Sequence, residues 1–272
     1  MKIKLSAIQL NSKASVKHNL DVIEKQLETL TKTSEEIENV VVLPECGLFF
    51  GANDKAQLSL AKQSQVNNDL QLALSAVAKK FKITFIGGTI PILTDCGNKF
   101  TNSSCAFNSS GMLIGRYDKI HLFDVNVEDN EKNYCESRFT QAGQAPCLVK
   151  TPFANIGLTV CFDVRFPMLF HKLTAMGADI ITVPSAFTRV TGKAHWQTLL
   201  QARAIENQVY IIAAGQEGVH ENGRETWGHS MIISPWGEIL SCLKEGEGII
   251  SSDYVPHEIK RIRASMPLKH TV

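Results

Sequence analysis

The sequence predicts a single α/β domain built around a layered sheet core. Short apolar runs of the strand type alternate along the chain with stripes typical of amphipathic helices. No low-complexity linker separates the two halves of the chain, and 44% of its 272 residues are hydrophobic, enough for a substantial core. The charged fraction of 20% excludes intrinsic disorder.

The first half opens with a strand and a helix. Residues 2–10 alternate in part between apolar and polar side chains, which predicts a strand. The apolar residues that follow recur at steps of four and three, which indicates one face of a helix: Val16, Leu20, Ile23, Leu27 and Leu30. The elements expected next are a buried strand at 40–43, a helix at 70–81, a buried strand at 83–88, and a hairpin at 103–119 that turns at Ser109-Ser110-Gly111.

The second half repeats this alternation. The expected strands are 156–160, 180–183 and 209–214, the expected helices are 167–176 and 194–207, and a hairpin is expected at 228–243. Between the halves, residues 124–146 form a polar loop that is long enough to be functional. We expect the domain to cover residues 1–255. Residues 256–272 form a C-terminal tail that packs on the domain or on a partner subunit, and its charged run at 258–263 predicts a short basic helix with a solvated face.

Charge and composition exclude several classes of protein. The 28 lysines and arginines nearly balance the 27 aspartates and glutamates, so we expect no nucleic-acid partner. No stretch reaches the roughly 18 apolar residues of a membrane helix, and the N-terminus resembles a strand rather than a signal peptide. We therefore expect a cytoplasmic protein without membrane association. The seven cysteines include no Cys-x-x-Cys pair, which disfavours a zinc site and a disulfide framework.

Two polar residues follow apolar strands and are candidates for catalysis. Cys161 comes directly after 156–160, where a sharp turn could present its thiol and backbone N–H groups could face an oxyanion. The alternative is a buried structural cysteine. Glu45 follows the apolar run 40–43, where a carboxylate is costly unless paired, so it indicates a general base or acid. The alternative is an exposed loop acid.

The other candidates carry little weight alone. Lys119 ends the hairpin and Glu136 lies in the polar loop, and both residue types are ordinarily solvated. His121 and His195 are rivals of Glu45 as the base for a cysteine nucleophile. The sequence has no Gly-x-Ser-x-Gly elbow, no phosphate-binding loop and no Gly-x-Gly-x-x-Gly motif, so it does not favour an α/β-hydrolase or a nucleotide-binding fold.

Three motifs in a fixed order nevertheless resemble a known family. Pro44-Glu45 is followed by the run from Tyr117 to Leu122 and then by the run from Val160 to Pro167, a pattern similar to the nitrilase (carbon–nitrogen hydrolase) superfamily. The likeness extends from the first strand to about residue 265. It implies a four-layer αββα sandwich, the pairing of two such units in a homodimer, and catalysis without a metal or an organic cofactor.

Matched position by position, the resemblance implies a catalytic triad. Cys161 is then the nucleophile that forms a thioester, Glu45 the acid and base, and Lys119 the cation. Glu136 matches a second glutamate that many members of the family keep near the triad. The backbone N–H of Phe162 is expected to hold the oxyanion together with the ammonium group.

A longer run narrows the expected reaction. The run from Pro184 to Trp196 is similar to the branch of the family that holds deaminated-glutathione amidases and ω-amidases, and Pro184-Ser185-Ala186-Phe187 favours the former. The resemblance thus implies an amidase whose small-molecule substrate, deaminated glutathione, is split into 2-oxoglutarate and cysteinylglycine. An ω-amidase for 2-oxoglutaramate is the nearest alternative, and a true nitrilase, a glutaminase unit and a non-catalytic binding protein are more distant ones. Residues 126–132 lack the Pro-Gly turn common in this branch, which leaves the shape of the substrate entrance open.

Such a substrate carries a carboxylate at each end, so cations or N–H donors are expected on both sides of the nucleophile. Arg165 lies four residues beyond Cys161, where some relatives place a carboxylate-binding arginine; the alternative is an ion pair with Asp163. Arg189, expected in a loop, and Arg203, one helix later, are further cations. The expected substrate-binding residues are Arg165, Phe187, Thr188, Arg189, His195 and Trp196, with Phe187 and Trp196 as walls of an open-ended pocket.

The resemblance also bears on the histidines and on assembly. His195 is then an element of helix packing or of the pocket wall rather than a base, and His121 is structural. The helix at 167–176 carries more apolar residues than one core-facing stripe requires, which agrees with a homodimer. The alternative is that all of them face the sheet.

Overall fold

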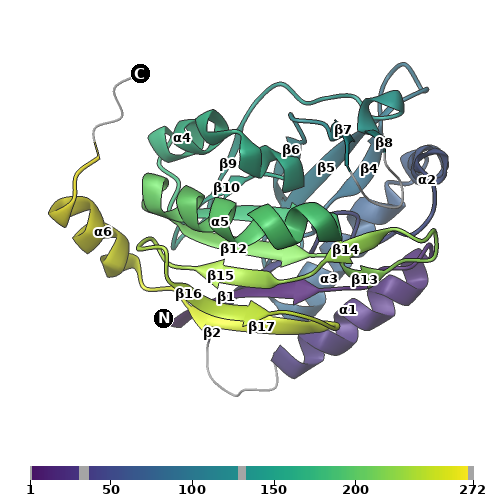
Figure 1. The fold of residues 1–272 in the computed structure, drawn as a ribbon. Helices are drawn as coiled ribbons and strands as arrows, with labels where there is room; N and C mark the ends of the chain where they lie inside the picture. Colours follow the sequence, from purple (N-terminus) through teal and green to yellow (C-terminus); the bar gives the residue numbers. More distant parts are fainter. Residues whose placement is uncertain (1, 31–36, 128–132, 269–272) are drawn as a thin grey trace.

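The fold consists of two stacked β-sheets with helices on both outer faces (Figure 1). The computed structural model describes residues 2–30, 37–127 and 133–268. The first sheet has the strand order β17-β1-β2-β3-β5-β4, with β6 paired to β5. Its strands are β1 (Lys2–Gln9), β2 (Ile37–Val42), β3 (Thr84–Ile86), β4 (Ile90–Leu93), β5 (Phe100–Phe107), β6 (Leu113–Asp118) and β17 (Gly248–Asp253).

The second sheet has the strand order β16-β15-β12-β11-β10-β9. Its strands are β9 (Cys147–Lys150), β10 (Asn155–Leu158), β11 (Ile180–Ser185), β12 (Tyr210–Gly215), β15 (Ser230–Ile233) and β16 (Ile239–Leu243). Strands β10, β11 and β12 run parallel, as do β1, β2 and β3 in the first sheet. Residues that follow parallel strands gather at one edge of a sheet, which is where open α/β sheets bind ligands.

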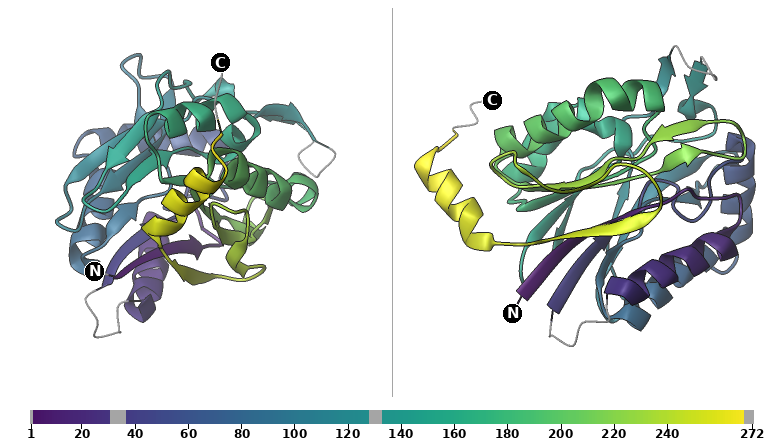
Figure 2. Two further views of the ribbon diagram at one scale, coloured as in Figure 1. Left: turned by 90° about the vertical axis from the view of Figure 1, so that its left-hand side faces the viewer. Right: turned by 60° about the horizontal axis from the view of Figure 1, so that its bottom comes forward.

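Helices complete the four layers that the family resemblance implied. Helices α1 (Val16–Leu30) and α3 (Asp69–Phe81) cover the first sheet, and α4 (Pro167–Ala175) and α5 (Arg189–Asn207) cover the second (Figures 1 and 2). The expected αββα sandwich is therefore confirmed. The expected strands, helices and hairpins of both halves are also present, with ends that differ by a few residues except in α5.

The period of two in the central strands explains the layering. Leu5 and Val40 point toward the second sheet and belong to the core between the sheets. Ile8 and Val41 lie an odd number of residues away from Leu5 and Val40, so they point the other way and pack under α1 and α3. Burying each such side chain contributes about 1.5–3 kcal/mol, so both faces of the first sheet stabilise the fold.

Helix α2 (Asp54–Gln65) was not predicted from the sequence. Only Leu58 and Ala61 of this helix are buried hydrophobic residues, so its apolar stripe is too narrow to stand out. Asn53 caps its first turn, because the Asn53 side chain accepts a hydrogen bond of 2.9 Å from the N–H of Ala56.

Helix α5 begins at Arg189, five residues before the expected start at 194, so the prediction that Arg189 lies in a loop was wrong. Thr191 and Gly192 are poor helix formers, which is why the sequence favours a loop there. Thr188 offsets this by capping the helix, since its hydroxyl accepts a hydrogen bond of 3.3 Å from the N–H of Thr191. Gly192 is required by packing, because a Cβ atom added there would lie 2.3 Å from Cβ of Trp227.

The polar segment 124–146 contains more regular structure than a loop. It holds the short hairpin of β7 (Asp124–Asn126) and β8 (Asn133–Cys135), followed by a 3-10 turn at Glu136–Arg138. A second hairpin consists of β13 (Glu217–Val219) and β14 (Glu225–Trp227), and it follows α5 and β12 in the sequence. Residues 128–132, most of the stretch that lacks the Pro-Gly turn, lie outside the described residues.

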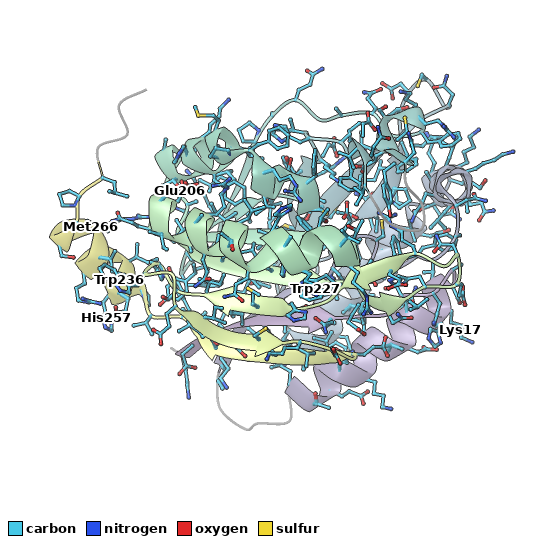
Figure 3. The ribbon with its side chains drawn as sticks, viewed as in Figure 1. Lys17, Glu206, Trp227, Trp236, His257 and Met266 are labelled. Atoms are coloured by element: carbon cyan, nitrogen blue, oxygen red, sulfur yellow. The ribbon has the colours of Figure 1, made fainter. Side chains whose placement is uncertain are left out.

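The C-terminal segment forms helix α6 (Pro256–Ser265) at one end of the molecule, near the turn that carries Trp236 (Figure 3). Ile259 and Ile262 are buried, while Arg261 pairs with Glu258 at 2.6 Å on the solvated face. The predicted basic helix at 258–263 is therefore present. Among the described residues, none of the helices has the length and apolar character that crossing a membrane requires.

Candidate active site

Four residues that follow strands of the two sheets converge at one place. Glu45 follows β2, Lys119 directly follows β6, Cys161 follows β10 and Ala186 directly follows β11. Glu45, Lys119 and Cys161 are only 5%, 1% and 6% exposed. Burying ionisable groups is costly unless they satisfy one another, so this convergence indicates a functional site.

Cys161 lies on a strained turn. Its backbone φ is +48°, a left-handed value that is unusual for a residue with a side chain. The 3-10 turn Cys161–Arg165 starts at this residue, so the N–H of Phe162 lies in its first turn, whereas the N–H of Asp163 donates to the Val160 carbonyl at 3.1 Å. The thiol contacts the Glu45 carboxyl group and the backbone N–H of Ala186.

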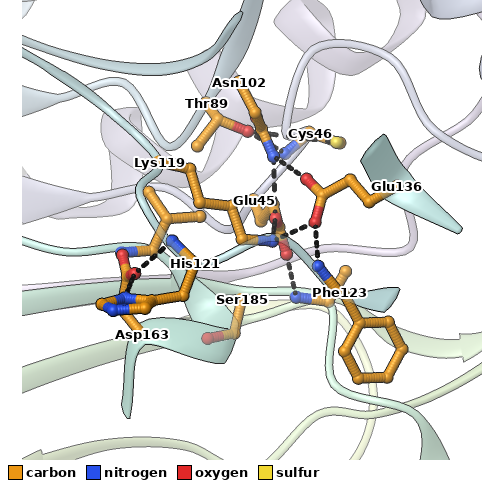
Figure 4. A network of polar contacts seen from close by, with 12 residues as sticks. Glu45, Cys46, Thr89, Asn102, Lys119, His121, Phe123, Glu136, Asp163 and Ser185 are labelled. Atoms are coloured by element: carbon orange, nitrogen blue, oxygen red, sulfur yellow. Dashed lines mark hydrogen bonds and ion pairs between the residues drawn. The ribbon is translucent and has the colours of Figure 1, made fainter. Parts of the chain in front are cut away.

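The carboxylate of Asp163 holds this turn in place through hydrogen bonds. Its carboxylate accepts hydrogen bonds of 2.8 Å from the Val160 N–H and 2.8 Å from the Tyr117 hydroxyl. It also contacts Nδ1 of His121 at 2.7 Å, and the His121 ring stacks on Phe166 (Figure 4). His121 therefore supports the turn through its contacts with Asp163 and Phe166.

Lys119 bridges two carboxylates. Its Nζ lies 2.8 Å from Oε1 of Glu45 and 2.8 Å from Oε2 of Glu136 (Figure 4). Asn102 of β5 connects the same pair, since its Nδ2 donates to Glu45 at 2.9 Å and to Glu136 at 3.2 Å. The second oxygen of Glu45 accepts a hydrogen bond of 3.0 Å from the N–H of Ala186, so each carboxylate oxygen of Glu45 has a fixed partner.

These contacts set the charges of the resting site. Burial alone would raise the pKa of Glu45, but the charge and hydrogen bond of Lys119 outweigh it and hold this pKa below its usual value. Burial likewise opposes the charge of Lys119, yet Glu136 and Glu45 raise its pKa well above the usual value. Burial, followed by the charge of Glu45, raises the pKa of the Cys161 thiol well above its usual value. The resting site therefore holds a carboxylate, an ammonium and a neutral thiol.

The cluster lies at the inner end of a cavity of about 330 Å3. This volume falls within the range of small-molecule sites. Phe123, Phe162, Phe187 and Tyr134 supply aromatic walls. The mouth reaches solvent, because the exposed side chains of Asn53, Asn133, Arg138 and Asn222 also line the cavity.

The structure brings only part of the expected substrate-binding set to this cavity. Phe187 and Thr188 line it, whereas Arg165, Arg189, His195 and Trp196 are not among its lining residues. The expectation that Trp196 forms a wall was wrong: it is 1% exposed and packs behind Phe187, with its Nε1 donating to the His229 carbonyl at 2.8 Å.

The three expected arginines have other surroundings. The Arg165 guanidinium lies 5.2 Å from the centre of the Phe187 ring and 3.3 Å from Nδ1 of His195. Arg189 pairs with Glu225 at 2.9 Å on the surface. Arg203 is 6% exposed and donates to the Val164 carbonyl at 2.8 Å, so it supports the turn after Cys161 from α5.

Other residues of the site were not identified from the sequence. Asn102 lies one residue before the predicted hairpin, and nothing in its neighbourhood marks it as a link between two carboxylates. Arg138 and Arg224 line the cavity from the segment after β8 and from the β13–β14 turn. A cation in a polar loop is ordinarily solvated, so no local pattern marks either arginine as part of a site.

A thiol, a carboxylate and an ammonium group that meet in a small-molecule cavity are what nucleophilic attack on an acyl carbon needs, so fold and site define a cysteine-type hydrolase. The family model described as carbon-nitrogen hydrolase matches residues 4–264, and the chain belongs to this family. It is 39% identical to a protein of Synechocystis named deaminated glutathione amidase, over 98% of this chain and 97% of that protein. It is 34% identical to omega-amidase NIT3 of Saccharomyces cerevisiae, over 98% of this chain and 92% of that protein.

Solved structures agree with this assignment. The crystal structure of Saccharomyces cerevisiae Nit3, described as a member of branch 10 of the nitrilase superfamily, aligns with a TM-score of 0.86 and 32% identity. The alignment covers 98% of this chain and 95% of the yeast chain. The nitrilase-type sandwich expected from the sequence motifs is thus confirmed by sequence and by fold.

Proposed function

We propose that this protein is an amidase that hydrolyses deaminated glutathione to 2-oxoglutarate and cysteinylglycine through a thioester on Cys161. The observation that carries the proposal is the closed cluster of thiol, carboxylate and ammonium at the inner end of a cavity with an open, cationic mouth. The Synechocystis relative with this name supports the choice of substrate.

The first half of the reaction forms the thioester. Glu45 is ionised and contacts the neutral Cys161 thiol, so it takes the thiol proton as the sulfur attacks the amide carbon. The Lys119 ammonium and the backbone N–H of Phe162 stabilise the negative oxygen that develops. Glu45 then gives its proton to the leaving nitrogen, the carbon–nitrogen bond breaks, and cysteinylglycine departs as a neutral amine.

The second half consumes one water. Glu45 accepts a proton from this water while its oxygen attacks the thioester carbon, and the same two donors stabilise the second oxyanion. Collapse breaks the carbon–sulfur bond, releases 2-oxoglutarate, and returns the proton to the Cys161 sulfur. Glu136 and Asn102 do not touch the reacting atoms in this scheme; they hold Lys119 and Glu45 in position.

The nearest alternative is an ω-amidase for 2-oxoglutaramate, which the yeast relative's name supports. The two substrates share the acyl group and differ in the leaving group, which is a dipeptide in one and ammonia in the other. An ω-amidase needs only a cavity closed beyond the amide. The exposed Asn133, Arg138 and Asn222 along the cavity favour the longer substrate, because they place polar groups where a dipeptide would extend.

A side-by-side turnover assay tests the proposal. We expect a higher kcat/KM for deaminated glutathione than for 2-oxoglutaramate when both are measured with the same enzyme preparation. A higher value for 2-oxoglutaramate would assign the protein as an ω-amidase. Inactivity on both, with a folded protein, would contradict the choice of this branch of the family.

We also propose a homodimer that works in the cytoplasm. Leu169, Phe170 and Leu173 of α4 face the core. Met168 of the same helix and Met176 directly after it are 58% and 44% exposed, which supports an apolar contact outside the protomer. A cysteine nucleophile must stay a free thiol, which a reducing compartment ensures. Light scattering should give twice the chain mass of 30.0 kDa; a mass of one chain at micromolar concentration would contradict the dimer.

A further inference from the structure

We propose that Arg138 and Arg224 form a subsite for the terminal carboxylate of the leaving dipeptide. This inference rests on the proposed function, since only a substrate with a peptide tail carries that carboxylate. It gives the mouth of the cavity a specific role. The two arginines replace Arg189 and Arg203, which the sequence suggested for carboxylate binding and which have other partners.

The first argument is the charge balance of the cavity. Among the described residues, three cationic side chains line it, Lys119, Arg138 and Arg224, together with the two carboxylates Glu45 and Glu136. Lys119 lies 2.8 Å from each of these two carboxylates, so both are already paired with a cation. No residue in the described part of the chain forms an ion pair or hydrogen bond with the Arg138 guanidinium. Within the described residues, the Arg138 guanidinium is therefore available to an anionic group of a substrate.

The second argument is the way Arg224 is held. Its guanidinium lies 4.8 Å from the centre of the Tyr134 ring and 5.3 Å from that of Phe50, both of which also line the cavity. The backbone N–H of Arg224 donates to the Asn222 side chain at 3.1 Å, and Asn222 Nδ2 donates to the Ala52 carbonyl at 3.1 Å. Arg224 is thus a half-buried, preorganised cation, and a guanidinium of this kind suits a planar carboxylate.

The third argument assigns the end of the substrate. The leaving nitrogen must lie next to Glu45, because Glu45 protonates it, and the acyl group stays on Cys161. Arg224 lines the same cavity as Glu45, whereas Arg165 does not line it. We therefore place the leaving group on the side of Arg224. The exposed Arg138 lies farther out along the same cavity, where the end of a dipeptide would reach.

The test is a binding experiment that does not depend on turnover. Cysteinylglycine and its C-terminal amide, cysteinylglycinamide, are titrated separately into the free wild-type enzyme by calorimetry. The two probes differ only in the terminal carboxylate, so the ratio of their affinities reports the subsite. We expect the wild-type enzyme to prefer the acid by about tenfold, the effect of one charge-assisted hydrogen bond.

Three variants locate the preference. Arg224→Met should reduce the preference about tenfold, which abolishes it. Arg138→Met, at an exposed position where solvent screens the charge, should reduce it about two- to fivefold. The matched control is Arg189→Met, which removes a surface arginine outside the cavity and should keep the wild-type ratio. Because Arg138 is exposed, its variant keeps the test available if Arg224→Met fails to fold.

Each outcome is decisive. No preference for the acid in the wild-type enzyme, or a wild-type ratio in both Arg138→Met and Arg224→Met, overturns the subsite. Loss of preference in Arg189→Met as well would show a general charge effect and overturns it too. Turnover of deaminated glutathione, measured in parallel, tests the proposed function separately: turnover without acid preference overturns the subsite alone, and acid preference without turnover overturns the function alone.

Discussion

Replacing Lys119 by methionine removes the cation from a buried site that holds two carboxylates. Glu45 and Glu136 each lie 2.8 Å from Lys119 Nζ, which is the group that neutralises both. Methionine keeps most of the side-chain volume, so the change tests charge rather than packing. We expect kcat to fall about 10²–10³-fold, the usual effect of losing one oxyanion donor.

Stability should fall as well. Removing one partner of a buried ion pair costs about 3–5 kcal/mol, because the remaining charge is left without compensation. Thermal unfolding of Lys119→Met at pH 7.5 measures this loss. The matched control is Lys80→Met, whose partner Glu24 lies at a similar 2.7 Å but on the surface, where we expect little change in Tm or kcat.

The pH dependence separates the electrostatic explanation from simple damage. In the wild-type enzyme Lys119 holds the pKa of Glu45 below its usual value, and without Lys119 both burial and the Glu136 charge raise it. A group with a raised pKa in the folded state stabilises the protein below its unfolded pKa and loses that contribution as pH rises through the folded value. The Tm deficit of Lys119→Met should therefore shrink between pH 7.5 and pH 5.

Two results would refute this reasoning. An unchanged kcat with only a raised KM would mean that Lys119 contributes uniform binding rather than transition-state stabilisation. A Tm deficit that is the same at both pH values would mean that the loss comes from packing and not from uncompensated carboxylates.

Three further predictions concern the same site. Glu45→Gln keeps an acceptor for the Ala186 N–H but cannot transfer a proton, so steady-state kinetics should show a kcat about 10²–10⁴-fold lower; a loss below about tenfold would exclude Glu45 as acid and base. The pKa of Glu45 is lowered from its usual value of 4.5 and that of Cys161 is raised from its usual value of 9.0, so the profile of kcat/KM against pH should be flat between these two values. A change of slope near pH 6.5 would point to a histidine instead. Asp163→Asn leaves fewer acceptor positions for the Val160 N–H and the Tyr117 hydroxyl, so the free energy of unfolding should fall by about 1–3 kcal/mol, and Tm and kcat should fall with it. A normal Tm with a normal kcat would contradict the role of Asp163 as the support of the turn.

The fold could be predicted where a strand is buried on both faces or a helix has a clear apolar stripe. The run Val40–Leu43 is continuously apolar because it lies between the second sheet and helix α1. Helix α2 was not predicted because most of its side chains are polar and only Leu58 and Ala61 are buried hydrophobic residues. Gly192 in the first turn of α5 is a poor helix former, and its reason, the packing against Trp227, is a tertiary contact that no local pattern marks.

The site was predictable to the extent that each residue belongs to a motif. Glu45, Lys119 and Cys161 stand in three recognisable runs, and the structure brings their side chains together. Asn102 and the N–H of Ala186 act through tertiary contacts, so no pattern along the chain marks them. Their contribution appears only when the two sheets are stacked.

Substrate-binding residues were the least predictable part. Trp196 is close to Phe187 in sequence, but it packs one layer behind Phe187 and away from the cavity. Sequence proximity to the nucleophile likewise suggested Arg165, whereas Arg138 and Arg224 reach the cavity from distant segments. Which way a side chain points from a loop depends on the packing of that loop, and this information is not local.

The most direct test of the central claim is to trap the acyl-enzyme. The enzyme is mixed with deaminated glutathione, quenched with acid during turnover and digested, and each cysteine-containing peptide is examined by mass spectrometry. Cys46 and Cys135 line the same cavity and serve as internal controls, and burial, followed by the Glu45 charge, raises the pKa of Cys46 to about 12. We predict the mass of one 2-oxoglutaryl group on the peptide that contains Cys161, and neither adduct nor turnover in Cys161→Ala. An adduct on Cys46 or Cys135, or near-wild-type turnover by Cys161→Ala, would contradict the assignment of Cys161 as the nucleophile.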